Sequence, residues 1–468
     1  MTNPPSFSLR LFLPVLLLAI IASPGCGGGP VTPAPGNSGG PVAGESTQVT
    51  VLLSSAANDK LASLHLDLSS ITLTGQSGNT VTLLQKPKNI ELIHLNGTVE
   101  PLLTATVPQD VYTSAAAAFS SAYFNYVFLT SNVNNVVPAG GPGTAKVNLA
   151  APIPVSGTAM VLSLTMPVSQ SANYSGEPMQ NDTIAPVFNL APLTLATPPT
   201  NAENGLLQNI NGSIAGVNTA AGSFTLVTPE GNTLTLQSGP STAYSGITGI
   251  AQLAAGQFVN LDAALHLDNS LLATRIEVPD TAASDFAVGP VLQIVPSSSS
   301  LIMDLVQAQG PDQNFNRAAG DVLWFSYPAA TFRISSQYRA PQNFPAMTFT
   351  AATMSPGQNV FVSLPAFSNL SPPPALATVT LLPQTINGLI QSCSGTAPET
   401  CSVVLAGYDP ISIFAGTSSV EVVITPSTQM LGGTSFTVGA TKRFHGFLFS
   451  NNGALVMVCD QVSRGVAM

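Results

Sequence analysis

The second half of the chain repeats itself, and this repetition limits the folds open to it. QNINGSI at Gln208–Ile214 returns as QTINGLI at Gln384–Ile390, and VGPV at Val288–Val291 stands between them. AAGQFVNL at 254–261 is echoed by SPGQNVFVSL at 355–364. Three copies are therefore expected, over residues 207–280, 286–383 and 384–466.

Each copy has the pattern of a small set of short strands. It begins with a glycine-containing strand and ends on a strand of alternating apolar residues. Its central threonine is Thr242, Thr331 or Thr428. A Gly-Gln turn is shared by the first two copies, at Gly256 and Gly357, and is missing from the third. Short alternating strands with regular turns predict three small β-barrels, which close their own sheets and so hide the strand edges.

Residues 47–195 also read as strands. In LASLHLDLSSITLT, Leu64, Leu66 and Leu68 alternate with polar residues, which places one face in a core and the other in water. The alternation changes phase at Ser69-Ser70, where a bulge or turn is expected. Ser77-Gly78-Asn79 predicts a hairpin turn. Residues 114–129 are interpreted as a short helix that leads into a strand from Tyr123 to Leu129.

Composition narrows the class further. Charged residues make up 7% of the chain and apolar residues 45%, with 39 Gly and 39 Pro. Disordered chains and bundles of exposed helices both need more charge than this. The net charge of −10 and the lack of any Lys/Arg run exclude the usual electrostatic footprint of nucleic-acid binding. The prediction is an all-β protein without a nucleic-acid partner.

The first 26 residues predict export. Leu11–Ala22 is an apolar run of about a dozen residues after a head whose only basic side chain is Arg10, too short for a membrane span. Ser-Pro-Gly-Cys at 23–26 resembles a bacterial lipobox, which implies acylation of Cys26. Several acyl chains on one cysteine would anchor the protein durably. Lipoboxes usually carry Leu where Ser23 stands, so the alternative is ordinary cleavage near Ala22 that leaves a thiol.

Two segments read as linkers. Residues 27–46 are rich in Gly and Pro and predict a tether, and residues 196–206 form a shorter linker. The tether contains Gly-Asn-Ser-Gly-Gly-Pro, which resembles the nucleophile segment of chymotrypsin-like proteases. That interpretation is rejected for Ser38, because no barrel strands precede it to supply a His and an Asp. A hydrolase elbow would need a strand before and a helix after the serine.

Two resemblances add an expected fold. Residues 47–195, with the step VPQDVY at Val107–Tyr112, resemble a domain of unknown function that often follows the lipobox of bacterial cell-surface lipoproteins. This implies an immunoglobulin-like or prealbumin-like β-sandwich. The three copies resemble a second domain of unknown function that recurs in tandem in bacterial secreted proteins, which implies barrels similar to the OB-fold. The ligands of OB-folds do not transfer with the fold.

The cysteines of the third copy predict a disulfide. Cys393 and Cys401 flank the turn-rich segment SGTAPET, and outside the cytosol such a pair is expected to form a disulfide. Cys459 then remains as a third cysteine outside this disulfide. The alternative is a Cys3His zinc site that also uses His445. Its spacings are wide and contain no C-x-x-C pair, so the disulfide is preferred and no metal is expected.

The remaining chemistry-bearing residues are interpreted as structural. Three histidines are expected at solvated strand positions: His65, His94 and His266. The densest acidic group is spread over strands and turns: Asp262, Asp268, Glu277, Asp280 and Asp285. Trp324, Phe325 and Tyr327 are assigned to a core strand in preference to a ligand platform. No catalytic residue and no cofactor is predicted.

These features lead to an expected function. The chain is predicted to be a non-enzymatic protein of the cell envelope, anchored by lipid in the outer membrane or at the cell surface after export through its signal peptide. Its role would be structural, adhesive or binding, with a glycan or another envelope protein as partner. The alternatives are a glycan- or small-ligand-binding module and a hydrolase with a site of scattered residues. The sequence leaves the oligomeric state open.

Overall fold

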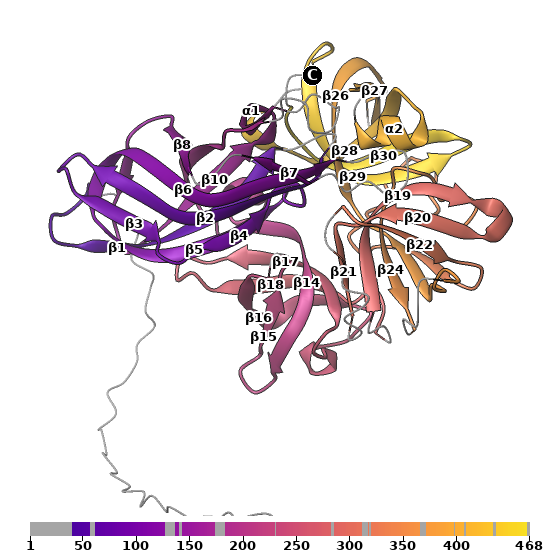
Figure 1. The fold of residues 1–468 in the computed structure, drawn as a ribbon, viewed down its shortest axis with the longest axis horizontal. Helices are drawn as coiled ribbons and strands as arrows, with labels where there is room; N and C mark the ends of the chain where they lie inside the picture. The colour runs from indigo at the N-terminus through magenta and orange to yellow at the C-terminus, as the bar shows by residue number, and fades with distance from the viewer. Residues whose placement is uncertain are drawn as a thin grey trace, which may run out of the picture. The chain divides into compact units, whose positions relative to one another are not determined.

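Strands dominate the computed structural model, and the predicted all-β fold is confirmed (Figure 1). The structure describes residues 40–56, 61–126, 136–139, 143–173, 183–229, 231–281, 285–310, 317, 320–365, 371–396, 398–406, 409–433 and 437–465. Four main sheets follow one another along the chain, and two of them are closed five-stranded barrels.

The first sheet has eleven strands. They are β1 Ser46–Ala56, β2 Leu61–Gly75, β3 Thr80–Leu84, β4 Lys88–Glu91, β5 Val99–Pro108, β6 Asp110–Tyr126, β7 Val136–Ala139, β8 Gly143–Leu149, β9 Ile153–Val155, β10 Ala159–Pro167 and β13 Val187–Leu193. The main path is β3-β2-β6-β8-β13-β10-β1-β5, with β4 on β2 and with β7 and β9 on β6. The helix α1 Val168–Ser171 and the small pair β11 Ala172–Asn173 and β12 Thr183–Ile184 precede β13.

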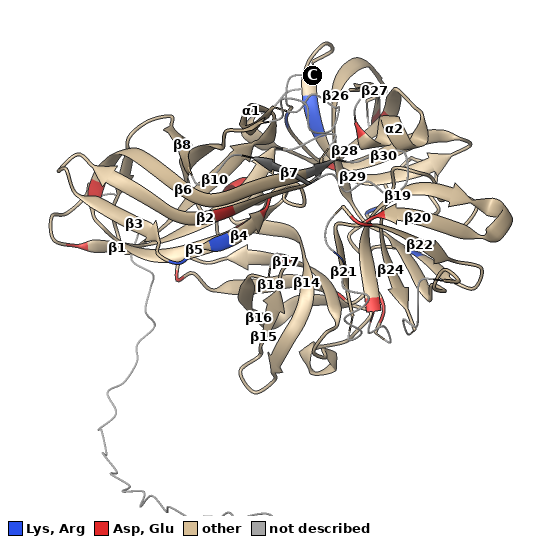
Figure 2. Ribbon diagram, in the orientation of Figure 1, with Lys and Arg blue, Asp and Glu red and all other residues tan. Residues whose placement is uncertain are grey.

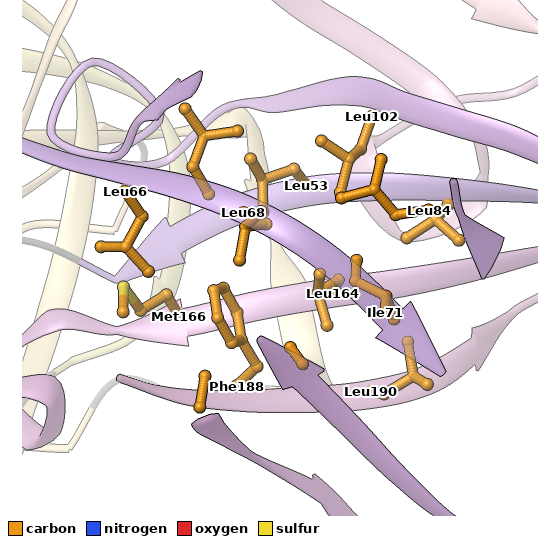
Figure 3. Packing of buried hydrophobic residues seen from close by; sticks show 14 of the residues in the cluster. Leu53, Leu66, Leu68, Ile71, Leu84, Leu102, Leu164, Met166, Phe188 and Leu190 are labelled. Atoms are coloured by element: carbon orange, nitrogen blue, oxygen red, sulfur yellow. The ribbon is translucent and has the colours of Figure 1, made fainter. Parts of the chain in front are cut away.

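This sheet folds over onto itself around one core, as expected of a β-sandwich. Its end strands β3 and β5 contact each other. Leu64, Leu66 and Leu68 are fully buried, as the alternation predicted. Figure 3 shows Leu66 and Leu68 of β2 packing with leucines from β1, β5 and β10 and with Phe188 of β13. Apolar side chains that point inward from opposite parts of the sheet thus share one core.

Three local expectations for this region can be compared with the structure. The pairing of β2 with β6 shifts register around Leu68, which confirms the predicted bulge next to Ser69-Ser70. The hairpin turn after β2 is present, with Gly78 at φ 85°. The helix expected from residue 114 is wrong, because this stretch belongs to strand β6. Pairing with β2 on one side and β8 on the other overrides the helical propensity of its alanines.

The two closed barrels have the same strand order, in which the first strand pairs with the second and fourth and the third runs parallel to the fifth. The first barrel contains β14 Leu206–Asn218, β15 Ser223–Val227, β16 Thr233–Ser245, β17 Phe258–Leu265 and β18 Leu271–Glu277. The last contains β26 Gln384–Ser394, β27 Glu399–Leu405, β28 Ser419–Met430, β29 Thr441–Asn451 and β30 Ala454–Arg464. Short helices lie before or between these strands: η1 Ala202–Asn204, η2 Ile250–Gln252, α2 Pro410–Ala415 and η4 Leu431–Gly433.

The middle copy forms a seven-stranded sheet with the same order of pairings. Its strands are β19 Asp285–Val295, β20 Ser300–Asp304, β21 Gln307–Gln309, β22 Val322–Ser326, β23 Thr331–Ile334, β24 Asn359–Leu364 and β25 Thr378–Leu381, with η3 Pro296–Ser298 after β19. β22 pairs with β20 and β23 pairs in parallel with β25. One long strand, β16, makes both pairings in the first barrel. A turn that includes Pro328 divides this strand in the middle copy, because proline supplies no ladder hydrogen bond.

One glycine turn recurs in all three copies. The glycine N–H donates to the carbonyl of the first strand at 2.8 Å each time: Gly256 to Ile214, Gly357 to Val291, and Gly439 to Ile390. The three φ angles are 82°, 84° and 87°, in the left-handed region that favours glycine. The third copy therefore keeps the turn that the sequence comparison missed, with Ala440 in the place of glutamine.

The central threonines fall into two groups. The hydroxyl of Thr242 donates to the carbonyl of Ala273 at 2.6 Å, and that of Thr428 donates to Cys459 at 2.8 Å. Each bridges the third and fifth strands where their register shifts. Thr331 starts β23 with an exposed side chain and does not take this place.

Candidate functional site

A cavity of about 190 Å³ lies where the turn between β4 and β5, strand β14, the middle sheet and the last barrel meet. Five amide side chains line it: Asn96, Asn209, Asn211, Asn359 and Gln384. Two imidazoles and two carboxyls also line it: His94, His445, Asp304 and Asp409. All four main sheets contribute to one cavity with both polar and apolar lining, so the site depends on how they pack together.

The turn between β4 and β5 packs onto the last barrel at Thr385. The Thr385 hydroxyl donates to the carbonyl of Asn96 at 2.9 Å, and the guanidinium of Arg443 donates to the Asn96 side chain. Gly97 has φ 84°, and a Cβ there would lie 2.5 Å from Oγ1 of Thr385. Glycine is thus required both by the backbone and by this close approach.

Thr385 and His445 form a hydrogen-bonded pair at the cavity wall, 2.9 Å from Oγ1 to Nδ1. A hydroxyl has one proton, and Thr385 already donates it to Asn96. His445 must therefore donate from Nδ1, so the imidazole is not placed to take a proton from the hydroxyl. This is the reverse of the arrangement that activates a nucleophile.

His94 is held between two glutamates. Its Nδ1 lies 2.9 Å from Glu91 and its Nε2 lies 3.3 Å from Glu100. Carboxylates only accept, so both ring nitrogens must carry hydrogen and the imidazole is positively charged. Burial disfavours charge on Glu91, yet the hydrogen bond and charge of His94 hold its pKa below the usual value. The expectation of a solvated strand position is wrong here, because this side chain is 10% exposed and lies in a turn.

The two cavity carboxyls resist ionisation. Asp304, at the end of β20, has its pKa raised to about 8 by burial and by the nearby charge of Asp321. Burial raises the pKa of Asp409 to about 7, although this side chain caps α2 by accepting the backbone N–H of Ile411 at 2.8 Å. At neutral pH Asp304 is therefore mostly protonated, and Asp409 is near its midpoint.

A buried ionic network extends from the cavity into the first barrel. Arg275 on β18 contacts Asp262 at 2.8 Å and Glu277 at 3.2 Å. Its guanidinium also donates to Asn260 at 2.5 Å. The Asn260 amide donates in turn to the cavity residues Asn209 and Asn211. Ser335 and Ser336 of the middle copy hydrogen-bond to Glu277, which ties two copies together.

This network corrects the view that the acidic group is merely spread along the chain. Asp262 and Glu277 converge on Arg275, whereas Asp280 accepts hydrogen bonds from Ser363 and Thr378. Asp268 lies in a turn with Ser270, and Asp285 is buried on β19. The sequence could have predicted the contact between Arg275 and Glu277, because residues two apart on a strand point to the same face.

The predicted disulfide between Cys393 and Cys401 is confirmed, with an S–S distance of 2.07 Å. Among the described residues, the grouping that could hold a metal is Cys393, Glu399 and Cys401, and the disulfide already uses both sulfurs. The Cys3His zinc alternative is thereby excluded. Cys459 is buried, and burial raises the pKa of its thiol well above the usual value.

The remaining residues singled out in the sequence lie outside the cavity or outside the described residues. Cys26 and Ser38 lie outside the described residues. His266 is exposed as expected, and His65 is half-buried and stacks on Tyr123 at 4.6 Å. Phe325 and Tyr327 are core residues, while Trp324 points outward with 48% exposure.

Two observations bear on the protein's surroundings. Within the described ranges, no helix has the length and apolar character needed to cross a membrane. Figure 2 shows the Lys and Arg residues of the described elements at separate positions along the ribbon.

Comparison with protein families identifies one region. Residues 211–277 match the family described as "Domain of unknown function (DUF5666)". The match runs from within β14 to the end of β18 and so covers most of the first barrel. No curated protein matches the sequence.

Proposed function

We propose that the protein is a non-enzymatic, lipid-anchored protein of the cell envelope with a structural, adhesive or binding role. In this proposal Cys26 carries the acyl chains, residues 27–46 form the tether, and the strands beyond it form the binding part. The membrane is its first partner, through the anchor, and a glycan or another envelope protein is the second. The sandwich over residues 47–195 and the barrel copies that follow it are the arrangement that the resemblance to surface lipoproteins implies.

The observation that carries the binding role is the cavity shared by the four sheets, whose wall holds polar side chains between apolar ones. Its side chains are held by one another, as in the Thr385 hydroxyl that donates to Asn96 and accepts from His445. A wall of fixed donors and acceptors favours recognition, because little ordering remains to be done when a ligand binds. The same wall offers no activated nucleophile at Thr385, which favours binding over catalysis.

The anchor is tested with an alkyne-tagged fatty acid fed to cells that express the full chain. Wild type should be labelled and sediment with membranes, whereas Cys26→Ala should lose the label and appear in the soluble fraction. Cys459→Ala is the matched control, because it removes a buried thiol and should keep the label. An unlabelled wild-type protein would contradict the proposal.

A hydrolase remains the competing proposal, because Thr385 and His445 lie within hydrogen-bonding distance, although the Thr385 hydroxyl donates to Asn96 and not to His445. Thr385→Val removes the hydroxyl while keeping the side-chain shape. Turnover of any ester, amide or glycoside that survives repurification and disappears in Thr385→Val would establish an enzyme. The proposal of a non-enzymatic protein predicts equal, background rates for both chains.

A further inference from the structure

We propose that the cavity shared by the four sheets binds one uncharged, hydroxyl-rich ring, a pyranose sugar unit that is either free or the end of a glycan chain. This inference rests on the proposed binding role and names its ligand class. Three features support it: the unpartnered side chain of Asp304, the charge of the cavity wall and the size of the cavity.

The side chain of Asp304 indicates where a ligand would bind. Its side chain is 4% exposed and lines the cavity. Within the described part of the chain, no hydrogen bond reaches its carboxyl group, and its one electrostatic neighbour is the like-charged Asp321. A buried polar group without a partner destabilises the folded protein. A ligand hydroxyl that both donates to and accepts from this carboxyl would recover that cost.

The neighbouring amides are already oriented. The Gln384 side chain accepts from the N–H of Asn359 at 2.8 Å and donates to the carbonyl of Gly357 at 2.9 Å. The Asn359 amide donates to the carbonyl of Pro383 at 3.2 Å. Each amide oxygen has two lone pairs, so acceptor capacity remains for ligand hydroxyls. Polar groups fixed in this way suit a ligand with several hydroxyls at set positions.

The charge of the wall favours a neutral ligand. The protonated His94 is more than compensated by the two carboxylates of Glu91 and Glu100, so this group carries one net negative charge. Asp304, with a pKa of about 8, is mostly neutral at pH 7, and Asp409 is near its midpoint. A neutral ligand can accept a hydrogen bond from the protonated Asp304, whereas an anionic ligand would be repelled by the negative charge of the acidic groups nearby.

The size and the apolar part of the wall favour a single ring. A volume of about 190 Å³ accommodates at least six water molecules at about 30 Å³ each, which is room enough for one sugar ring. Val288, Val306 and Pro410 add apolar surface to the wall. A pyranose matches this mixture, because its ring faces carry C–H groups and its edge carries hydroxyls.

The test is isothermal titration of the full chain, purified in detergent, with methyl glycosides of glucose, galactose, mannose and N-acetylglucosamine. Glucosamine and galacturonate serve as the cationic and anionic probes. At least one neutral glycoside should bind more tightly than both charged probes. A disaccharide that ends in the same sugar distinguishes a glycan end from a free sugar.

Variants locate the binding in the cavity. Asp304→Leu should weaken binding about tenfold, which corresponds to the loss of one good hydrogen bond. Asp304→Asn keeps a neutral polar group and should bind within about threefold of wild type. Asp268→Asn, in the exposed turn before β18, is the matched control. Val306→Trp fills the cavity and leaves Asp304 unchanged, so it tests the site if Asp304→Leu fails to fold.

Three results would overturn the inference: no probe binds, glucosamine binds in preference to the neutral sugars, or binding survives both Asp304→Leu and Val306→Trp. Acylation of Cys26 is measured on the same preparation. A labelled chain that binds no sugar contradicts the ligand class alone. An unlabelled chain that binds a neutral sugar contradicts the anchor alone.

Discussion

At the scale of single residues, burial sets the chemistry of this protein more than residue type does. Asp304 and Asp268 have the same side chain, yet burial raises the pKa of Asp304 to about 8 while hydrogen bonds from Ser270 lower that of Asp268. Likewise His266 is exposed and His94 is enclosed by Glu91 and Glu100. From the sequence, both histidines were expected at solvated strand positions, and Asp304 was given no role.

The buried Asp304 should make folding sensitive to pH. Its pKa is about 8 in the folded protein and about 3.9 in an unfolded chain. Between these values the folded state holds a proton that the unfolded state has lost, so the free energy of unfolding falls as pH rises, by at most about 1.4 kcal/mol per pH unit. Asp304→Asn should flatten this slope between pH 5 and 8 in urea titrations. A wild-type slope retained by Asp304→Asn would contradict this assignment.

Removal of Arg275 should be costly, because it would leave two carboxylates buried without their cation. Arg275→Met is expected to lower the free energy of unfolding by about 3 kcal/mol. Arg339→Met removes an exposed arginine of the middle copy and should change it by less than about 0.5 kcal/mol. Equal losses for the two variants would show that the network adds no stability.

At the scale of elements, the three copies share turns and bridges that their sequences show only in part. The Gly-Gln pair was visible in two copies, and the third kept only Gly439. The sequence marked a central threonine in each copy without giving it a role; Thr242 and Thr428 bridge two strands, but the split third strand of the middle copy displaces Thr331. A local motif persists in sequence only where its backbone geometry demands a particular residue.

The shared turn can be tested at Gly439. Its φ of 87° is unfavourable for a residue with a Cβ, although nothing lies within 4 Å of one there. Gly439→Ala should therefore lower the free energy of unfolding by about 1 kcal/mol through the backbone alone. Gly249→Ala is the control, since Gly249 also has open space but an extended φ of 173°. Equal effects at both positions would remove the argument for a shared left-handed turn.

At the scale of the whole molecule, alternation and repetition predicted the all-β architecture and the barrels. They did not predict the cavity, because its residues come from segments as far apart as Asn96 and His445. Nor did they predict that β6 would continue through its alanines, since pairing with two neighbouring strands decides that. Contacts between distant segments leave no local pattern in a single sequence, whereas the disulfide of Cys393 with Cys401 was predictable because its loop is short.

In the proposed function, an acylated Cys26 holds this folded region at a membrane, and the location of the protein depends on that anchor. Cys26, outside the described residues, decides whether the cavity is held at a membrane or released. The two processing routes predict different first residues, so the mature N-terminus distinguishes them without any assumption about ligand.

The most direct measurement is the mass of the N-terminal peptide of the protein purified from cell membranes. The account predicts a peptide that begins at Cys26 and carries the added mass of its acyl groups. A peptide that begins at Ser23, just after Ala22, with an unmodified Cys26 would contradict it and make the protein a secreted one.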